Sequence, residues 1–261
     1  MLKICSLLLF LANYGCIVAQ TEETPFSLGW GGGIDVIWNK DEAASPLPYE
    51  GFGLPVGING GQMAGNWMHR FELRLILPLL TNDYPLKSKA NTRLRDWTKV
   101  DINYQLLRRV GSGSVAWLGG GWSSQLFYRT YHFLDGRGWE WQNSMNVIYA
   151  HQVSIRSKSF LLPQVSLPVV GFIHRRPTLT YDEAFLDDFY NRGVIALLKY
   201  GRWLLPSKKW LSFEFNVFYL NNSSDRWDLQ GAIGFNVQQF TFPERVRTIN
   251  VPLRWYLNYQ W

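Results

Sequence analysis

The four histidines are the first residues to test for chemistry, because a histidine beside a serine can act as general base for a serine nucleophile. In an extended strand such a pair has to lie two residues apart, since alternate side chains share one face. His151 is three residues from Ser154, which sends the two side chains to opposite faces. The positions two residues after His69, His132 and His174 hold phenylalanine, leucine and arginine. The spacing of a strand-borne hydrolase pair is therefore missing.

Ten charged residues stand on the polar side of segments in which polar and apolar residues alternate. Arg70, Glu72 and Arg74 occupy three successive positions of one such face. The set has four basic and six acidic members, and charges away from water are tolerated when they neutralise one another. We predict a mutually paired plug, with a small polar pore as the alternative. The ten residues are Asp35, Arg70, Glu72, Arg74, Lys99, Asp101, Glu140, Glu214, Asp228 and Arg254.

The segments that carry these residues have a period of two. Between residues 249 and 261 the odd positions are Ile, Val, Leu, Trp, Leu, Tyr and Trp, whereas the even positions are mostly polar. The same alternation runs through residues 70–77, 99–106, 211–219 and 227–238. No apolar run after the first 20 residues has the length of about 20 residues that a membrane helix needs. The sequence therefore predicts an all-β protein.

Long strands favour a membrane barrel over a soluble β-sandwich, which shows the same alternation. The segments here extend for about 10 residues or more, whereas soluble strands commonly have about 5 or 6. Tryptophans also stand at segment ends, as in the aromatic girdles of membrane barrels. These are Trp30, Trp38, Trp67, Trp97, Trp139, Trp141, Trp203, Trp210 and Trp227. We predict an antiparallel transmembrane β-barrel over residues 21–261.

Eleven segments show strand character, but bacterial barrels of one chain have an even number of strands. The short turns 111–114 and 157–159 and the longer connections 81–96 and 129–138 fit opposite ends of the barrel only if one more strand is added. A weak strand at 178–186 gives about twelve, which we predict; ten is the alternative if the region 52–66 is a loop. The segments are 26–38, 52–63, 67–79, 97–109, 114–128, 138–154, 158–174, 192–203, 209–221, 226–240 and 248–261.

The first twenty residues have a different character. One early charge at Lys3, an apolar run over residues 4–12 and small residues near Ala19 are typical of a secretory signal peptide. We predict a signal at 1–20, with lipid attachment at Cys16 as the alternative. Because Cys5 and Cys16 are the only cysteines, the chain after cleavage has no thiolate for a disulfide or a zinc site. We expect no metal and no cofactor.

The C-terminal residues Leu257, Tyr259 and Trp261 share one parity and end in an aromatic side chain. This ending is similar to the C-terminal assembly signal of outer-membrane β-barrel proteins. The resemblance covers the architecture of the whole mature chain, and it implies the outer membrane of a Gram-negative bacterium and recognition by the barrel-assembly machinery. It names a superfamily and implies no activity.

Four basic residues lie between two predicted strands, at Lys87, Lys89, Arg93 and Arg95. If this connection is external, we expect it to contact lipopolysaccharide phosphates in addition to outer-membrane lipid; a solvated loop is the alternative. The net charge of +6 is too small to predict a nucleic-acid partner.

Outer-membrane barrels of this size include phospholipases, lipid A deacylases and omptin-like proteases. The omptin-like arrangement of acidic and Asp–His pairs is imitated only in part by Asp187 and Asp188 with His132 or His174. We therefore predict a non-enzymatic barrel that serves as an accessory or scaffold subunit of an envelope complex for secretion, assembly or uptake, together with a protein partner. A small-solute channel and a lipid-modifying enzyme are the alternatives.

Overall fold

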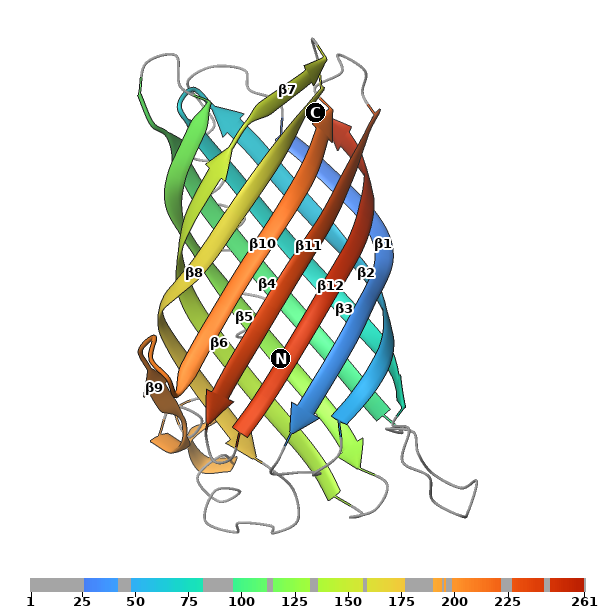
Figure 1. Cartoon of the computed structure of the whole chain (residues 1–261), viewed down its shortest axis with the longest axis vertical. Helices are drawn as coiled ribbons and strands as arrows, with labels where there is room; N and C mark the ends of the chain where they lie inside the picture. Colours follow the sequence, from blue (N-terminus) through green and yellow to red (C-terminus); the bar gives the residue numbers. More distant parts are fainter. Residues whose placement is uncertain are drawn as a thin grey trace.

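The computed structural model describes residues 26–41, 48–81, 96–111, 115–131, 136–156, 159–176, 190–193, 195, 199–221, 227–241 and 245–260. Nearly all of them are in strands, which lie side by side around a common axis and share one tilt (Figure 1). The strands are β1 (Phe26–Asp41), β2 (Pro48–Ala64), β3 (Trp67–Thr81), β4 (Asp96–Arg109), β5 (Ala116–Tyr131), β6 (Gly136–His151), β7 (Val153–Arg156), β8 (Ser159–Arg176), β9 (Arg202–Leu204), β10 (Trp210–Asn221), β11 (Trp227–Thr241) and β12 (Arg245–Gln260). The predicted all-β antiparallel barrel is confirmed.

Ten of the twelve strands close the barrel. Each pairs antiparallel with its neighbour, β1 pairs with β12, and β8 pairs with β10 across the segment that holds β9. The short strands β7 and β9 both pair with β8 and lie outside the closed wall, at opposite ends of the molecule (Figure 1). A wall of ten strands satisfies the even number expected of a single-chain barrel.

The strand expected at 192–203 is the error in the sequence-based count. Residues 190–192, 195 and 199–200 are helical, and only the three residues of β9 are extended there. The ten-strand alternative assumed that the region 52–66 is a loop, but this region lies almost entirely in β2. The weak strand expected at 178–186 falls outside the described residues. Because residues 192–203 do not form a wall strand, β4 ends and β8 begins at the same end of the barrel. The predicted turns beside them, 111–114 and 157–159, therefore need no added strand to belong to one end.

The two ends of the barrel differ in their connections. At one end, here called the turn end, Ser27 of β1 pairs with Gln260 of β12, and β2 passes to β3 through residues 65–66. At the opposite end, here called the loop end, the connections include residues 82–95 and 177–209. In outer-membrane barrels, short connections typically lie at the end where the first strand begins and the last strand ends, and long connections lie at the opposite end.

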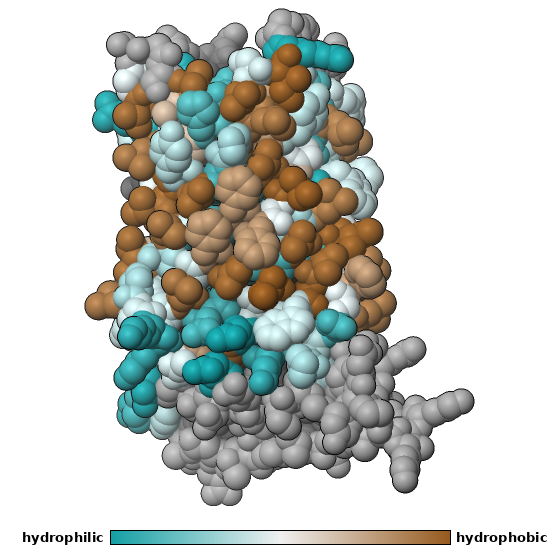
Figure 2. All heavy atoms as spheres, viewed as in Figure 1, coloured by the Kyte–Doolittle hydropathy of each residue, from teal (hydrophilic) through white to brown (hydrophobic). Residues whose placement is uncertain are grey.

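The outer face of the barrel is apolar. Outward positions on different strands of the wall, such as Val56, Leu75 and Leu253, are exposed to about half of their surface or somewhat less. Figure 2 shows this as a broad brown band over the wall, followed by a hydrophilic zone toward the loop end. No helix among the described residues is long and apolar enough to cross a membrane. A soluble protein rarely leaves so large an apolar surface in water, so this face is suited to lipid.

Tryptophans are exposed near both margins of the band, as predicted for aromatic girdles. Near the turn end these are Trp30, Trp67 and Trp227, and near the loop end Trp203 on β9 is exposed. Trp210, which lies at the loop end and was expected in a girdle, is instead only 4% exposed and packs inside the barrel. Beyond the band at the loop end, outward positions become polar, and we call these residues the loop-end collar: Lys40, Glu50, Gln239, Arg245 and Arg247.

An arginine in the middle of the band is expected to destabilise the barrel far more than one at its margin. Leu73→Arg places a charge near the middle of the band in β3 and should lower the free energy of unfolding by about 2–4 kcal/mol, whereas Leu79→Arg, close to the collar, should cost about 0–1 kcal/mol. Denaturant titration of both variants folded in lipid vesicles measures this difference. Equal costs at the two positions would contradict a membrane-spanning band.

Glycines on the inner face allow the first and last strands to approach closely. Gly31 and Gly33 occupy successive inward positions of β1. A Cβ atom at Gly31 would lie 1.9 Å from the carbonyl oxygen of Trp255, and one at Gly33 would lie 2.1 Å from that of Leu253. Both oxygens belong to β12, so the seam that closes the barrel depends on the absence of side chains at these positions.

Candidate functional site

The barrel interior is the candidate site, because all ten charged residues predicted for the lumen lie on the inward face. Asp35, Asp101, Glu140 and Asp228 are each at most 2% exposed. Several carboxylates accept hydrogen bonds from neutral amides: Asp35 from Asn250 at 3.3 Å, Glu214 from Asn216 at 2.7 Å and Asp228 from Gln260 at 2.8 Å. Alternating parity thus placed these residues on a single face, as strand geometry requires.

Five of them, from β3, β4 and β12, form a central charge cluster: Glu72, Arg74, Lys99, Asp101 and Arg254. Asp101 lies 2.9 Å from Arg74 Nη2 and 3.0 Å from Lys99 Nζ. Glu72 Oε2 faces Arg74 Nε at 3.4 Å and Arg254 Nη1 at 3.7 Å. Tyr256 also donates a hydrogen bond to Glu72 Oε1. Interlocked partners of this kind compensate the loss of hydration that burial imposes on each ion.

A second ion pair joins Glu140 to Arg175 at 3.0 Å, and sequence reasoning missed its basic partner. Arg175 faces inward because the register between β6 and β8 shifts at Met145 and Asn146, which adds one residue to β8. Inward positions of β8 are even before this bulge and odd after it. Pro168 and Gly171 within the strand are the sequence signal that could have indicated the irregularity.

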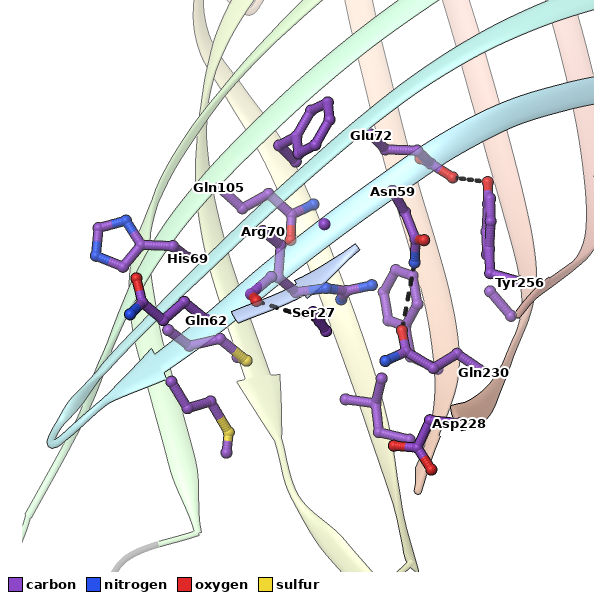
Figure 3. A pocket seen from close by; sticks show the side chains of 18 of the residues that line it. Ser27, Asn59, Gln62, His69, Arg70, Glu72, Gln105, Asp228, Gln230 and Tyr256 are labelled. Carbon is purple, nitrogen blue, oxygen red and sulfur yellow. Dashed lines mark hydrogen bonds between the residues drawn. The ribbon is translucent and has the colours of Figure 1, made fainter. Parts of the chain in front are cut away.

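A cavity of about 410 Å³ lies in the turn-end half of the lumen (Figure 3). Polar residues of its lining include Asn59, Arg70, Glu72, Gln230 and Tyr256. Sequence reasoning placed Arg70 and Glu72 on the inner face but did not indicate a cavity. Its volume depends on the size of many side chains from different strands, which alternation does not report.

Beyond this cavity the lumen narrows to small voids. The two voids around the central charge cluster measure about 40 and 20 Å³, enough for one to three water molecules at most. At the loop end, Ile173, Trp210, Phe240 and Val246 form one apolar cluster, and Ile37, Tyr49, Leu80 and Phe127 form another. Among the described residues, the lumen is thus filled over its middle and its loop-end half.

The three described histidines lie on different strands, β3, β6 and β8. His69 contacts the Tyr104 hydroxyl at 2.9 Å, and His151 is exposed at the end of β6. His174 is buried and stacks on Trp139 at a ring distance of 4.6 Å. The candidate protease residues His132, Asp187 and Asp188 lie outside the described residues. No group of three or more metal-ligating side chains occurs within the described ranges.

The remaining predicted sites lie at the surface or outside the described ranges. Leu257 is on the outer face of β12, and the ring of Tyr259 packs edge-on against Trp227 at 5.0 Å. Trp261 lies outside the described residues, and so do the four residues of the basic connection, Lys87, Lys89, Arg93 and Arg95.

Comparison with known proteins identifies the fold. The sequence matches no protein-family profile and no curated protein. The structure is similar to the outer membrane protease OmpT from Escherichia coli, with a TM-score of 0.52 and 7% identity over 93% of this chain and 100% of that one. It also matches the translocator domain of the autotransporter NalP from Neisseria meningitidis, with a TM-score of 0.41 and 8% identity over 98% of this chain and 96% of that one. The likeness to OmpT shows the fold alone, which is that of outer-membrane β-barrels.

Proposed function

We propose that this barrel resides in the outer membrane of a Gram-negative bacterium as a non-conducting accessory or scaffold subunit of an envelope complex. The observation that carries the proposal is the filled lumen: a paired charge cluster at the centre and two apolar clusters at the loop end. A barrel whose bore is occupied by its own side chains has its outer wall, its rim and its connections available for other molecules. The proposal includes no catalytic step.

Three kinds of partner follow from this proposal. The apolar band contacts outer-membrane lipid, and the basic connection at residues 82–95 binds lipopolysaccharide phosphates. The barrel-assembly machinery recognises the C-terminal Leu257, Tyr259 and Trp261. A stable protein partner docks at one rim, and its recovery in stoichiometric amount after purification in mild detergent identifies the envelope process. A barrel recovered alone from native membranes would argue against the scaffold role.

Electrical recording tests the filled lumen directly. The purified chain in a planar bilayer is expected to give no discrete conductance steps, because the voids that the described residues leave around the central charge cluster hold only a few water molecules. A matched variant, Arg74→Ala combined with Trp210→Ala and Phe240→Ala, removes bulk at the centre and at the loop end and should conduct if it inserts. Heat-modifiable migration on a gel verifies that both proteins are folded.

A small-solute channel is the second candidate, and one observation favours it. Asn103 lines the large cavity and both small voids, so polar spaces follow one another along the lumen. Discrete steps from the unmodified chain in the same recordings would support this channel and refute the non-conducting scaffold.

A further inference from the structure

We propose that the turn-end cavity binds a single-chain anionic amphiphile of the fatty-acid class, with its carboxylate at Arg70 and its chain against the apolar wall. The cavity volume of about 410 Å³ falls within the range of small-molecule sites, about 300–1,000 Å³. Its lining combines the guanidinium of Arg70, which Figure 3 shows among the polar side chains, with apolar side chains from several strands. A ligand with one charged and one apolar end fits that combination.

Arg70 is the cation available to such a ligand. Its guanidinium carbon lies 3.7 Å from the centroid of the Phe218 ring, a contact that holds the group in place but supplies no acceptor in the plane of its N–H groups. The Nη1 atom is buried and has no hydrogen-bond partner among the described residues. A buried guanidinium nitrogen without an acceptor is costly, and a carboxylate is the acceptor that matches its geometry best.

The neighbouring carboxylate does not fill this role. Glu72 follows Arg70 on the same inward face, but Tyr256 occupies its Oε1 atom, and Arg74 and Arg254 face its Oε2 atom. Arg70 is the one arginine or lysine of the cavity lining, and the two carboxylates there, Glu72 and Asp228, both have partners of their own. The other carboxylate of the lining, Asp228, accepts a hydrogen bond from Gln260 on β12.

The apolar wall lies beside Arg70. It is formed by Met63 and Met68, which are paired across β2 and β3, and by Phe160, Phe218 and Leu220 on β8 and β10. Met63 packs against a third hydrophobic cluster inside the barrel, and the other four side chains belong to it. This cluster also contains Leu107, Trp117, Ile148 and Leu162, whose packing holds the apolar wall in position. Burial of an acyl chain here contributes about 0.8 kcal/mol for each CH₂ group.

The position of the cavity also suits an amphiphile. Ser27, Asn221 and Gln260, at the ends of their strands, line it, so it reaches the turn end of the barrel. Exposed Trp67 and Trp227 lie at the same end and mark the level of the membrane surface. Single-chain lipids concentrate at that level, which brings them close to the entrance.

Native mass spectrometry of the full chain released from a non-ionic detergent tests the proposal, with laurate as the probe. We expect one laurate per barrel, and binding weaker by about tenfold or more for dodecanol and for inorganic phosphate, because each lacks one half of the interaction. Arg70→Met should weaken laurate binding by about tenfold or more, whereas Arg108→Met, on the outer face of β4 at the same end, should not.

Two outcomes would overturn the proposal. Equal laurate binding by Arg70→Met and Arg108→Met would mean that the acyl chain only associates with the outer surface, and phosphate binding as tight as that of laurate would mean an anion site without an apolar half. If Arg70→Met does not fold, as judged by heat-modifiable migration, Ala232→Phe decides. This change fills the cavity and leaves Arg70 in place, so laurate binding should be lost, and unchanged binding would refute the site.

Discussion

Replacing Gly31 with valine is expected to prevent closure of the barrel. A Cβ atom at this position would lie 1.9 Å from the Trp255 carbonyl oxygen and 2.8 Å from the Tyr256 Cα atom, and backbone atoms cannot rotate away as a side chain can. β12 would have to move off β1, which breaks hydrogen bonds along the closing seam. We expect a loss of more than about 3 kcal/mol in the free energy of unfolding. The fraction of heat-modifiable protein after refolding in detergent measures this effect.

Gly120→Val is the matched control for this substitution. Gly120 is on the outer face of β5, and the nearest atom to an added Cβ is the Asn146 carbonyl oxygen at 3.5 Å, an ordinary contact. A β-branched residue on a lipid-facing position of a strand should be tolerated or slightly stabilising. If both glycine variants refold equally well, the first and last strands are not as close as described.

Removing the carboxylate of Asp101 is expected to destabilise the barrel by about 3–5 kcal/mol, because Asp101→Ala leaves buried cations without their shared partner. Asp101 is 1% exposed and binds both Arg74, at 2.9 Å, and Lys99, at 3.0 Å. Urea unfolding of the variant in detergent micelles, followed by tryptophan fluorescence, measures the change. Glu50→Ala, which removes an exposed carboxylate from the loop-end collar, should cost no more than about 1 kcal/mol.

A second substitution separates charge from lost packing. Asp101→Ala removes the carboxylate that Arg74 and Lys99 share. Adding Lys99→Met removes one of these two cations, so part of the lost stability should return. The coupling free energy between positions 99 and 101 should therefore differ clearly from zero. Strictly additive costs, or an Asp101→Ala cost no larger than that of Glu50→Ala, would show that the central charge cluster contributes little to stability.

The wall of the barrel was predictable from the sequence because strand parity is a local property. The terminal segment 248–261 alternates over its full length and corresponds to β12, and the paired segments 209–221 and 226–240 correspond closely to β10 and β11. The error at 192–203 has a physical cause. Val194 to Leu198 is a short continuous apolar run, and such a run does not distinguish a strand from a helix.

The interior was predictable only in its polarity. Alternation placed Arg74 and Asp101 on the same face, but their contact depends on the register between β3 and β4, which pairs these two residues directly. Arg175 escaped notice because the bulge in β8 reverses the parity that alternation assumes. The cavity at Arg70 depends on the way in which side chains from distant strands pack across the lumen. The sequence of a single segment does not contain this information.

The polar collar at the loop end has a consequence for the height of the molecule above the membrane. A strand of 16 residues such as β12 is about 54 Å long, and at a tilt of about 40° it rises about 40 Å, whereas the apolar band of such barrels is about 25 Å tall. Outward positions of β12 are apolar as far as Leu257 at the turn end but become Arg247 and Arg245 at the loop end, so most of the surplus of about 15 Å lies on the loop-end side. In the proposed outer membrane, the strands there continue as a rigid rim above the lipid headgroups. A partner that sits on Arg245, Arg247 and Glu50 would be held clear of the bilayer, on a support that hydrogen bonds between strands keep rigid.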